Sequence, residues 1–184
     1  GAHKNDGNGS KSGHARIYTW NGTAWSQLGS DIDGEATDDE SGFSVSLAGN
    51  GTVVAVSAHQ NDGNGTNAGH TRIYTWNGTT WNQLGNDIDG EAANDESGYS
   101  VAISNDGNTV AIGARLNDGS GTNSGQTRIY NWNGTTWSQL GSDIDGEASD
   151  DESGFSVSLS DDGSTVAIGA RQNDGNGTNS GHVR

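Results

Sequence analysis

A repeat of 56 residues is the feature that most constrains what this chain can fold into. The triplet Asn-Asp-Gly begins at Asn5, Asn61, Asn117 and Asn173, and each start lies 56 residues after the one before it. Two tryptophan positions keep the same step: Trp20, Trp76, Trp132, and Trp25, Trp81, Trp137. The 184 residues hold three such units and 16 further residues. A period in this range is typical of propellers, solenoids and repeat arrays.

Each unit has the sequence pattern of four antiparallel strands. In residues 154–159, Phe155, Val157 and Leu159 alternate with serines, which predicts a half-buried strand. An Asp-Gly turn leads to a second strand over 165–170, because glycine accepts the positive φ of a tight hairpin. The third strand follows a polar loop and is clearest at 70–76. An Asn-Gly turn and a fourth strand that starts near Thr80 complete the unit, and no window has helical periodicity.

The composition predicts how these units must pack. Only 28% of the residues are hydrophobic, and 31 are glycine. A single four-stranded sheet with so few large apolar residues is not expected to be stable alone, since such sheets need a packed face. We therefore expect successive sheets to stack face to face, as the blades of a β-propeller do. The fold class is all-β, with tandem four-stranded meanders, and a three-fold β-trefoil-like domain is the alternative.

The motifs of the unit resemble a known repeat family. Gly42-Phe43-Ser44-Val45, the Asp-Gly hairpin and Val110–Arg115 (VAIGAR) are similar to the FG-GAP repeat of integrin-α-type propellers. The resemblance covers essentially the whole chain and implies one propeller blade per 56 residues. It divides the array into a partial first blade, two blades and a partial last blade, at residues 1–41, 42–97, 98–153 and 154–184.

The two ends of the chain repeat one segment. Residues 1–16 and 169–184 occupy the same positions of the repeat, so both would compete for one place in a ring closed by this chain alone. Three blades are also too few for a propeller, which usually has about four to eight. The chain is then a piece of a longer propeller, a partner for copies of itself, or a unit of an open array. Unfinished blades expose strand edges, which pair with other chains.

An acidic segment recurs before each first strand and raises the question of a metal site. Its third copy reads SDIDGEASDDESG over 142–154. The spacing fails the EF-hand template, since a glycine falls at position 12 where glutamate is needed. A solvated loop and a looser calcium site remain as alternatives. The candidate calcium ligands are Asp31, Asp33, Glu35, Asp87, Asp89, Glu91, Asp143, Asp145 and Glu147.

Repetition argues against an enzyme. Catalysis by carboxylates needs two acids in different environments, whereas here near-identical copies recur. The chain has no cysteine, so thiolate metal sites and cysteine nucleophiles are excluded. The histidines at 14, 70 and 182 share one repeat position, and no unit offers three convergent zinc ligands. We predict no catalytic residues and no certain cofactor, with calcium as the one candidate.

The tryptophans and the sequons complete the candidate sites. Each Trp pair flanks an Asn-Gly turn, so its members can face each other across two strands; stacking on sugar rings is the alternative role. Glycosylation is a hypothesis that depends on a secretory source, and three of the sequons lie in the Asn-Gly turns. The sequons are Asn8, Asn21, Asn50, Asn64, Asn77, Asn133 and Asn176.

The net charge of −16 argues against nucleic acid and anionic membranes as partners, because both are polyanions. No apolar run approaches the roughly 18 residues that span a bilayer. We expect a non-enzymatic, extracellular or cell-surface structural or adhesive protein that self-assembles through blade edges, as an oligomer or a filament. The alternative is a propeller module that binds glycans or surface proteins through its loops.

Overall fold

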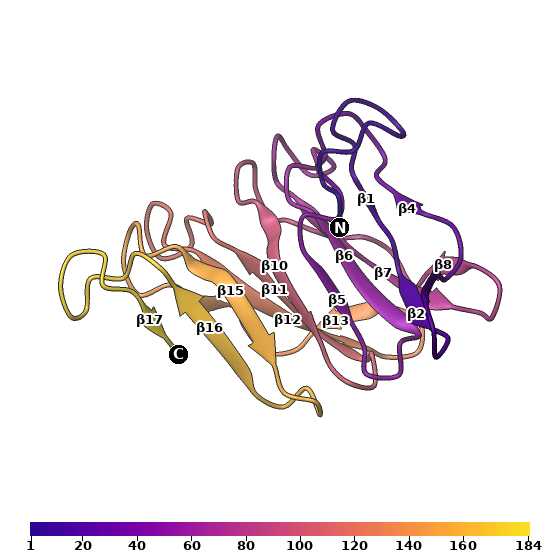
Figure 1. Cartoon of the computed structure of the whole chain (residues 1–184). Coiled ribbons are helices and arrows are strands. Elements are labelled where there is room, and N and C mark those ends of the chain that lie inside the picture. Colours follow the sequence, from indigo (N-terminus) through magenta and orange to yellow (C-terminus); the bar gives the residue numbers. More distant parts are fainter.

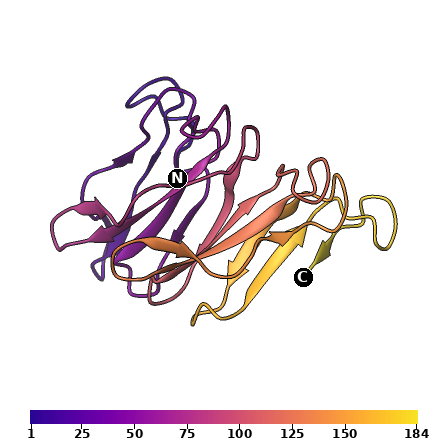
Figure 2. The ribbon, with the colours of Figure 1, turned by 180° about the vertical axis from the view of Figure 1, so that it is seen from behind.

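The computed structural model describes residues 1–184 and contains strands and turns but no helix. The sheets stand side by side in chain order (Figure 1), and the view from behind shows the same open row (Figure 2). The first and last sheets lie at opposite ends of the row. The chain therefore forms propeller-type blades, as the sequence predicts, and not the single three-fold domain of the β-trefoil alternative. No helix is available that could cross a membrane.

Two sheets are complete blades. The first has the order β5-β6-β7-β8, and β9 pairs with the first two residues of β7. Its strands are β5 (Val45–Leu47), β6 (Val53–Ala58), β7 (His70–Trp76), β8 (Trp81–Gln83) and β9 (Ile88–Asp89). The second has the order β10-β11-β12-β13, with β14 on β12. Its strands are β10 (Ser97–Ile103), β11 (Thr109–Ala114), β12 (Gln126–Trp132), β13 (Trp137–Gln139) and β14 (Ile144–Asp145). All pairs are antiparallel, so each blade is the expected meander.

The two ends of the row are partial blades. The first contains only the third and fourth strand positions, each in two pieces: β1 (His14–Ala15), β2 (Tyr18–Trp20), β3 (Trp25–Gln27) and β4 (Ile32–Asp33). The last contains the first two positions and the start of the third: β15 (Ser153–Leu159), β16 (Val166–Ala170) and β17 (His182–Val183). The last blade thus has the first and second strand positions, which the first blade lacks, and the first blade has the fourth position, which the last lacks.

Short polar motifs fix the local structure of each blade. In the Asp-Gly turn between β10 and β11, Asp106 accepts hydrogen bonds from the Ser104 hydroxyl (2.6 Å) and the Asn108 amide (3.0 Å). At the start of β10 the pairing shifts between Ser97 and Ser100, and Gly98 there has φ +87°. A glycine in the left-handed region allows such a bulge, which explains the glycine before each aromatic of the Gly-Phe or Gly-Tyr motif.

The core lies between blades. One cluster joins Ile73 and Ile88 of the first complete blade to Val110 and Ile112 of the second. A smaller one joins Ile17 and neighbouring residues of the partial first blade to β6. Because apolar burial is the main favourable contribution to folding, each blade is stabilised mostly by its neighbour, which agrees with the low apolar content.

Candidate functional site

Each Asn-Gly hairpin turn carries two tryptophans that face each other across the strands. Trp76 is the register partner of Trp81, and their ring centroids lie 5.4 Å apart. The same pairing occurs in the other two units, at 5.6 and 5.5 Å. Cross-strand aromatic pairs contribute roughly 0.2–1 kcal/mol each. The cross-strand pairing predicted from the sequence is confirmed.

The second and third Trp pairs also contact the preceding blade. The indole Nε1 of Trp81 donates to the carbonyl oxygen of Leu28, and that of Trp137 to Leu84, both at 2.8 Å. The residue after each leucine is glycine, and a Cβ at Gly29 would lie 2.6 Å from Cζ3 of Trp76. The Leu-Gly dipeptide thus forms the seat for the next Trp pair.

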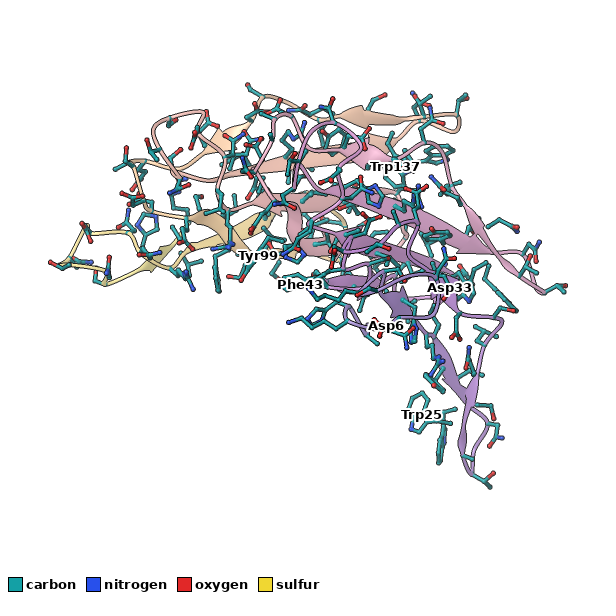
Figure 3. All side chains as sticks on the ribbon, turned by 90° about the horizontal axis from the view of Figure 1, so that it is seen from above. Asp6, Trp25, Asp33, Phe43, Tyr99 and Trp137 are labelled. Atoms are coloured by element: carbon teal, nitrogen blue, oxygen red, sulfur yellow. The ribbon has the colours of Figure 1, made fainter.

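The first Trp pair has no such seat. Trp25 is 67% exposed, and Figure 3 shows it on a hairpin that projects away from the other sheets, whereas Trp137 lies among them. The difference arises because no blade precedes the first one in this structure. The exposed aromatic surface at this end belongs to an inter-blade contact that is formed twice elsewhere in the chain.

Arginines of the third strand position bridge neighbouring blades. Arg72 pairs with Glu35 of the preceding acidic loop and with Asp87 of its own blade, the latter at 2.7 Å. The Arg72 hydrogen bond is the main reason that the pKa of Asp87 lies below its usual range. The later copies repeat the bridge, Arg128 with Glu91 and Arg184 with Glu147, both at 3.5 Å. Much of the acidic loop therefore serves blade-to-blade contacts.

The candidate calcium ligands are only partly brought together. Three ligand atoms lie within 4.8 Å of one another in His14/Asp31/Asp33 and in Glu35/His70/Asp87. The expectation that no unit offers three convergent ligands is therefore wrong for the first unit, because the fold brings its histidine to the acidic loop. Arginine is already present in both groups: Arg16 binds Asp31 at 2.7 Å, as Arg72 binds Asp87. The hydrogen bonds of Arg16 and Gln27 lower the pKa of Asp31 to about 2.

The other candidate ligands do not gather in the same way. Asp89 and Glu91, and the third-unit set of Asp143, Asp145 and Glu147, form no group of three ligands. In the third unit Gln126 takes the place of the histidine, and its amide donates to Glu91 at 2.8 Å. A cation at any of these loops would compete with a side chain that is already bonded, and calcium binding stays a prediction.

Buried acids that the sequence did not single out hold the acidic loop in place. Asp39, Asp95 and Asp151 are 3–4% exposed. Each accepts a hydrogen bond from the asparagine of the next Asn-Asp-Gly triplet; the Asn61–Asp39 bond is 3.0 Å long. Burial raises the pKa of Asp95. The signal was available, since both motifs repeat in step, but their contact requires the fold.

Aromatic and cationic side chains form a row along the starts of the first strands. Phe43 lies 5.0 Å from Tyr99, as ring centroids, and the two are side by side in Figure 3. Phe155 continues the row 5.2 Å beyond Tyr99. His59 packs on Phe43 at 3.9 Å, and burial, followed by the nearby Arg115 and His3, lowers the pKa of His59 to about 4.

Two equivalent grooves open between neighbouring blades. The first has a volume of about 310 Å³ and is lined by Asp31, Asp33, Tyr74, Thr80 and Trp81, among others. The second, of about 360 Å³, has the corresponding residues one unit later. Carboxylates beside aromatic rings provide hydrogen-bond acceptors next to a stacking surface, which suits a sugar ring.

All seven sequon asparagines are exposed. Those of the Asn-Gly turns, Asn21, Asn77 and Asn133, use Oδ1 to accept backbone amide hydrogen bonds within the turn. The amide nitrogens of Asn8 and Asn64 donate across to backbone carbonyls of the acidic loops, at 2.8 and 2.7 Å. Asn50 and Asn176 lie in a turn and a loop, and glycosylation stays a prediction at every site.

The geometry defines the class of protein: an all-β repeat protein. Its propeller-type blades stand in a row and are joined by indole, arginine and carboxylate contacts. Comparison with protein families agrees, since the profile of the FG-GAP repeat matches residues 88–130 and 143–183. The chain thus contains FG-GAP repeats over residues 88–130 and 143–183.

Solved structures share this fold. One is a candidate 6-phosphogluconolactonase from Bacteroides uniformis, with a TM-score of 0.61 and 11% sequence identity. The match covers 89% of this chain but only 43% of that one. At this identity the likeness concerns the fold alone. No curated protein sequence matches significantly.

Proposed function

We propose that this chain is a non-enzymatic structural or adhesive module of the cell exterior that assembles with copies of itself. The observation that carries the proposal is the contact between successive blades, which the chain forms twice with the same residues. Within the chain, one blade surface fits the next through the same contacts twice, and at each end one half of that contact surface is left exposed.

The use of the ionisable groups supports a non-enzymatic role. Arginines and glutamates, residue types that catalysis often uses, are paired with one another: Arg115 bridges Glu96 of one acidic loop (2.8 Å) and Glu152 of the next (3.2 Å). The grooves come in equivalent copies, whereas acid–base catalysis relies on groups with different environments. A location outside the cell is supported by the FG-GAP repeat, which is typical of extracellular and surface proteins, and by the exposure of the sequons.

The mass of the 184-residue chain in solution tests self-assembly. Light scattering across a hundredfold range of concentration should give a mass that rises above the 18.9 kDa of one chain. A mass of one chain throughout that range would refute self-assembly. Intact mass spectrometry of material from the native source tests the exterior location, where hexose-bearing species are expected.

A second candidate function is carbohydrate binding in the inter-blade grooves. The observation that favours it is the pairing of Trp81 with Asp31 and Asp33 in one groove, repeated one unit later. Titration with a panel of oligosaccharides should quench indole fluorescence if sugars stack there. The variant Asp33→Asn should then weaken binding, because the lost charge removes a strong acceptor.

A further inference from the structure

The two ends of the row present different surfaces. We call Tyr18, Trp20, Trp25, Val45 and Leu47 the N-face; these side chains are 43–67% exposed. We call Leu140, Gly141, Ser156, Ser158 and Ala167 the C-face, and all five are exposed. The N-face is large and apolar, and the C-face is mostly small. Exposed apolar patches of this kind mark interaction surfaces.

The same two surfaces meet inside the chain, which shows how they fit. One unit later than the N-face, Val101 and Ile103 are only 7% and 8% exposed. Their backbone amides donate to the hydroxyls of Ser44 (3.2 Å) and Ser46 (3.1 Å) on the preceding blade. The counterparts of those serines at the far end of the chain are Ser156 and Ser158.

The alanine of the second strand and the Leu-Gly seat are likewise covered inside the chain and exposed at its far end. Ala55 and Ala111 are 0% exposed because the next blade covers them, whereas Ala167 is exposed. A Cβ at Gly85 would lie 2.8 Å from a ring atom of Trp132, while a Cβ at Gly141 would meet nothing within 4 Å. Every element of the internal contact therefore recurs at the two ends, one half on each face.

We propose that, for the chain of residues 1–184, the N-face of one copy docks on the C-face of a second copy, so that their half-blades merge into one four-stranded blade. This inference rests on the proposed self-assembly and specifies its contact. By the internal pattern, Trp25 Nε1 donates to the Leu140 carbonyl of the second copy. The amides of Val45 and Leu47 meet the hydroxyls of Ser156 and Ser158 there.

The strand edges fit in a defined register. In the second complete blade, Thr109 pairs with Asn131 and Val110 with Tyr130. Thr165, just before β16, and Val166 hold the repeat positions of Thr109 and Val110, and Thr19 and Tyr18 of β2 hold those of Asn131 and Tyr130. Across the two copies, Thr165 should therefore pair with Thr19, and Val166 with Tyr18. The merged blade takes strands β15 and β16 from one copy and β2 and β3 from the other.

The segment that now lies on this edge is short and partly exposed. Arg184 exchanges two backbone hydrogen bonds of 2.9 Å with Ile168, but Val183 is 72% exposed. Arg16 stands at the same repeat position as Arg184, so it can take over both this edge and the ion pair with Glu147. The docking thus exchanges one copy of the duplicated segment for the other and keeps the charge balance.

Complementary face variants provide the main test. Trp25→Ala removes the anchor of the N-face, and Leu140→Asp places a charge in the seat of the C-face. A buried tryptophan anchor in an interface commonly accounts for a large share of affinity, so each variant alone should weaken self-association at least about 30-fold by light scattering. A mixture of the two should form a complex of two chains, because each variant keeps the face that the other lacks.

The mixture also shows that both variants fold, since only folded faces can restore the complex. If wild-type chains associate and both single variants associate equally well, the docking is wrong while self-assembly stands. If wild-type chains never associate, both proposals fail. If the variants are weakened but the mixture gives no complex of two chains, the pairing of these two faces is overturned.

Engineered disulfides test the register directly, because the chain has no cysteine of its own. Directly opposed residues of antiparallel strands have Cβ atoms about 4.5–5.5 Å apart, close enough for a disulfide after a small shift. A mixture of Thr19→Cys and Thr165→Cys chains should form the mixed crosslink under mild oxidation, identified by peptide mass spectrometry. Thr23→Cys, in the exposed hairpin turn, is the matched control for Thr19→Cys. Equal crosslinking of both to Thr165→Cys would overturn the register.

Discussion

Trp137 and Trp25 occupy the same position of the repeat but differ in environment. Trp137 packs against the preceding blade and donates to the Leu84 carbonyl at 2.8 Å, whereas Trp25 is 67% exposed. Val101 and Val45 differ in the same way, at 7% and 43% exposed. Near-identical sequence therefore does not give each unit its own core. In this fold a blade's burial is a property of the contact with its neighbour, and stability resembles a sum of nearest-neighbour contacts.

The largest expected effect on the free energy of unfolding comes from truncating a buried apolar side chain, compared with its exposed counterpart at the same repeat position. Ile103→Ala should lower the free energy of unfolding by roughly 2–5 kcal/mol, because Ile103 is 8% exposed inside the inter-blade cluster. Leu47→Ala, at the same repeat position but 48% exposed, should cost under about 1 kcal/mol in dilute protein. Urea unfolding measures both. Equal losses would mean that each blade buries its own core.

Acid should destabilise the chain through His59. Its pKa in the folded chain is about 4, below the 6.5 of the unfolded state, because burial disfavours the charged ring. The unfolded state thus binds more protons between these values, so stability is complete above pH 6.5 and falls as the pH drops toward 4. The full loss is roughly 3 kcal/mol.

Thermal unfolding between pH 7 and pH 4 tests this dependence. His59→Gln should flatten the part of the curve that belongs to this group, since glutamine does not titrate in this range. His3→Gln should change the curve much less: His3 shares the repeat position of His59, is only half-buried, and is the smallest of the causes that lower the pKa of His59. If the two variants change the pH curve equally, burial of His59 is not the cause.

Alanine variants at two equivalent glycines distinguish the cost of overpacking from the cost of backbone strain. Gly85 and Gly141 have φ values of +81° and +80°, so alanine is strained equally at both. Only at Gly85 would the added Cβ meet the tryptophans of the next blade. Gly85→Ala should therefore cost roughly 1–3 kcal/mol more than Gly141→Ala, the usual cost of overpacking. Similar unfolding midpoints in dilute protein would remove the role assigned to the Leu-Gly seat.

The indole hydrogen bond should have a smaller effect. Trp137→Phe keeps an aromatic ring but loses the bond to Leu84, which should cost about 1 kcal/mol. Trp25→Phe removes no hydrogen bond in the single chain and should change unfolding little. The difference between the two variants, measured by urea unfolding, gives what the indole adds at the packed position beyond the change of ring at the exposed one. A difference near zero would show that the bond to Leu84 does not stabilise the chain.

The repeat made much of this fold predictable. The 56-residue step, the period-2 alternation and the turn motifs gave the strand order and the Trp76–Trp81 pairing, because these depend on residues close in the chain. The contacts between blades were not predictable in the same way. The Arg72–Glu35 bridge and the Asn61–Asp39 bond join motifs that are 37 and 22 residues apart. Their geometry follows from how sheets stack, which the periodicity of one unit does not encode.

The acidic segment shows the same limit. Its spacing ruled out an EF-hand, but the sequence offered no reason to separate Asp39, which is buried and bonded to Asn61, from its neighbour Asp38, which is exposed. Nor did it show that arginines would lie among the candidate calcium ligands. Charge density alone predicted where cations could gather, and only the fold shows which carboxylates are already paired.

Calcium provides the last and smallest expected effect. Since Arg72 already pairs with Glu35 and Asp87, millimolar calcium should shift the midpoint of thermal unfolding by less than about 2 °C, a change of under about 1 kcal/mol for a chain of this size. The variant Arg72→Ala removes the competing guanidinium and leaves Glu35, His70 and Asp87 together. Its calcium-dependent shift should be larger than that of the wild type.

Arg128→Ala is the matched control for this experiment. It removes the corresponding guanidinium one unit later, where Gln126 replaces the histidine and no group of three ligands forms. Each variant is compared with itself with and without calcium, so the stability lost with the arginine cancels. A calcium response confined to Arg72→Ala would show that the loop can bind the cation and that arginine normally excludes it. No response in either variant would mean that the acidic loop has no latent calcium site, and that its charges serve the joints between blades.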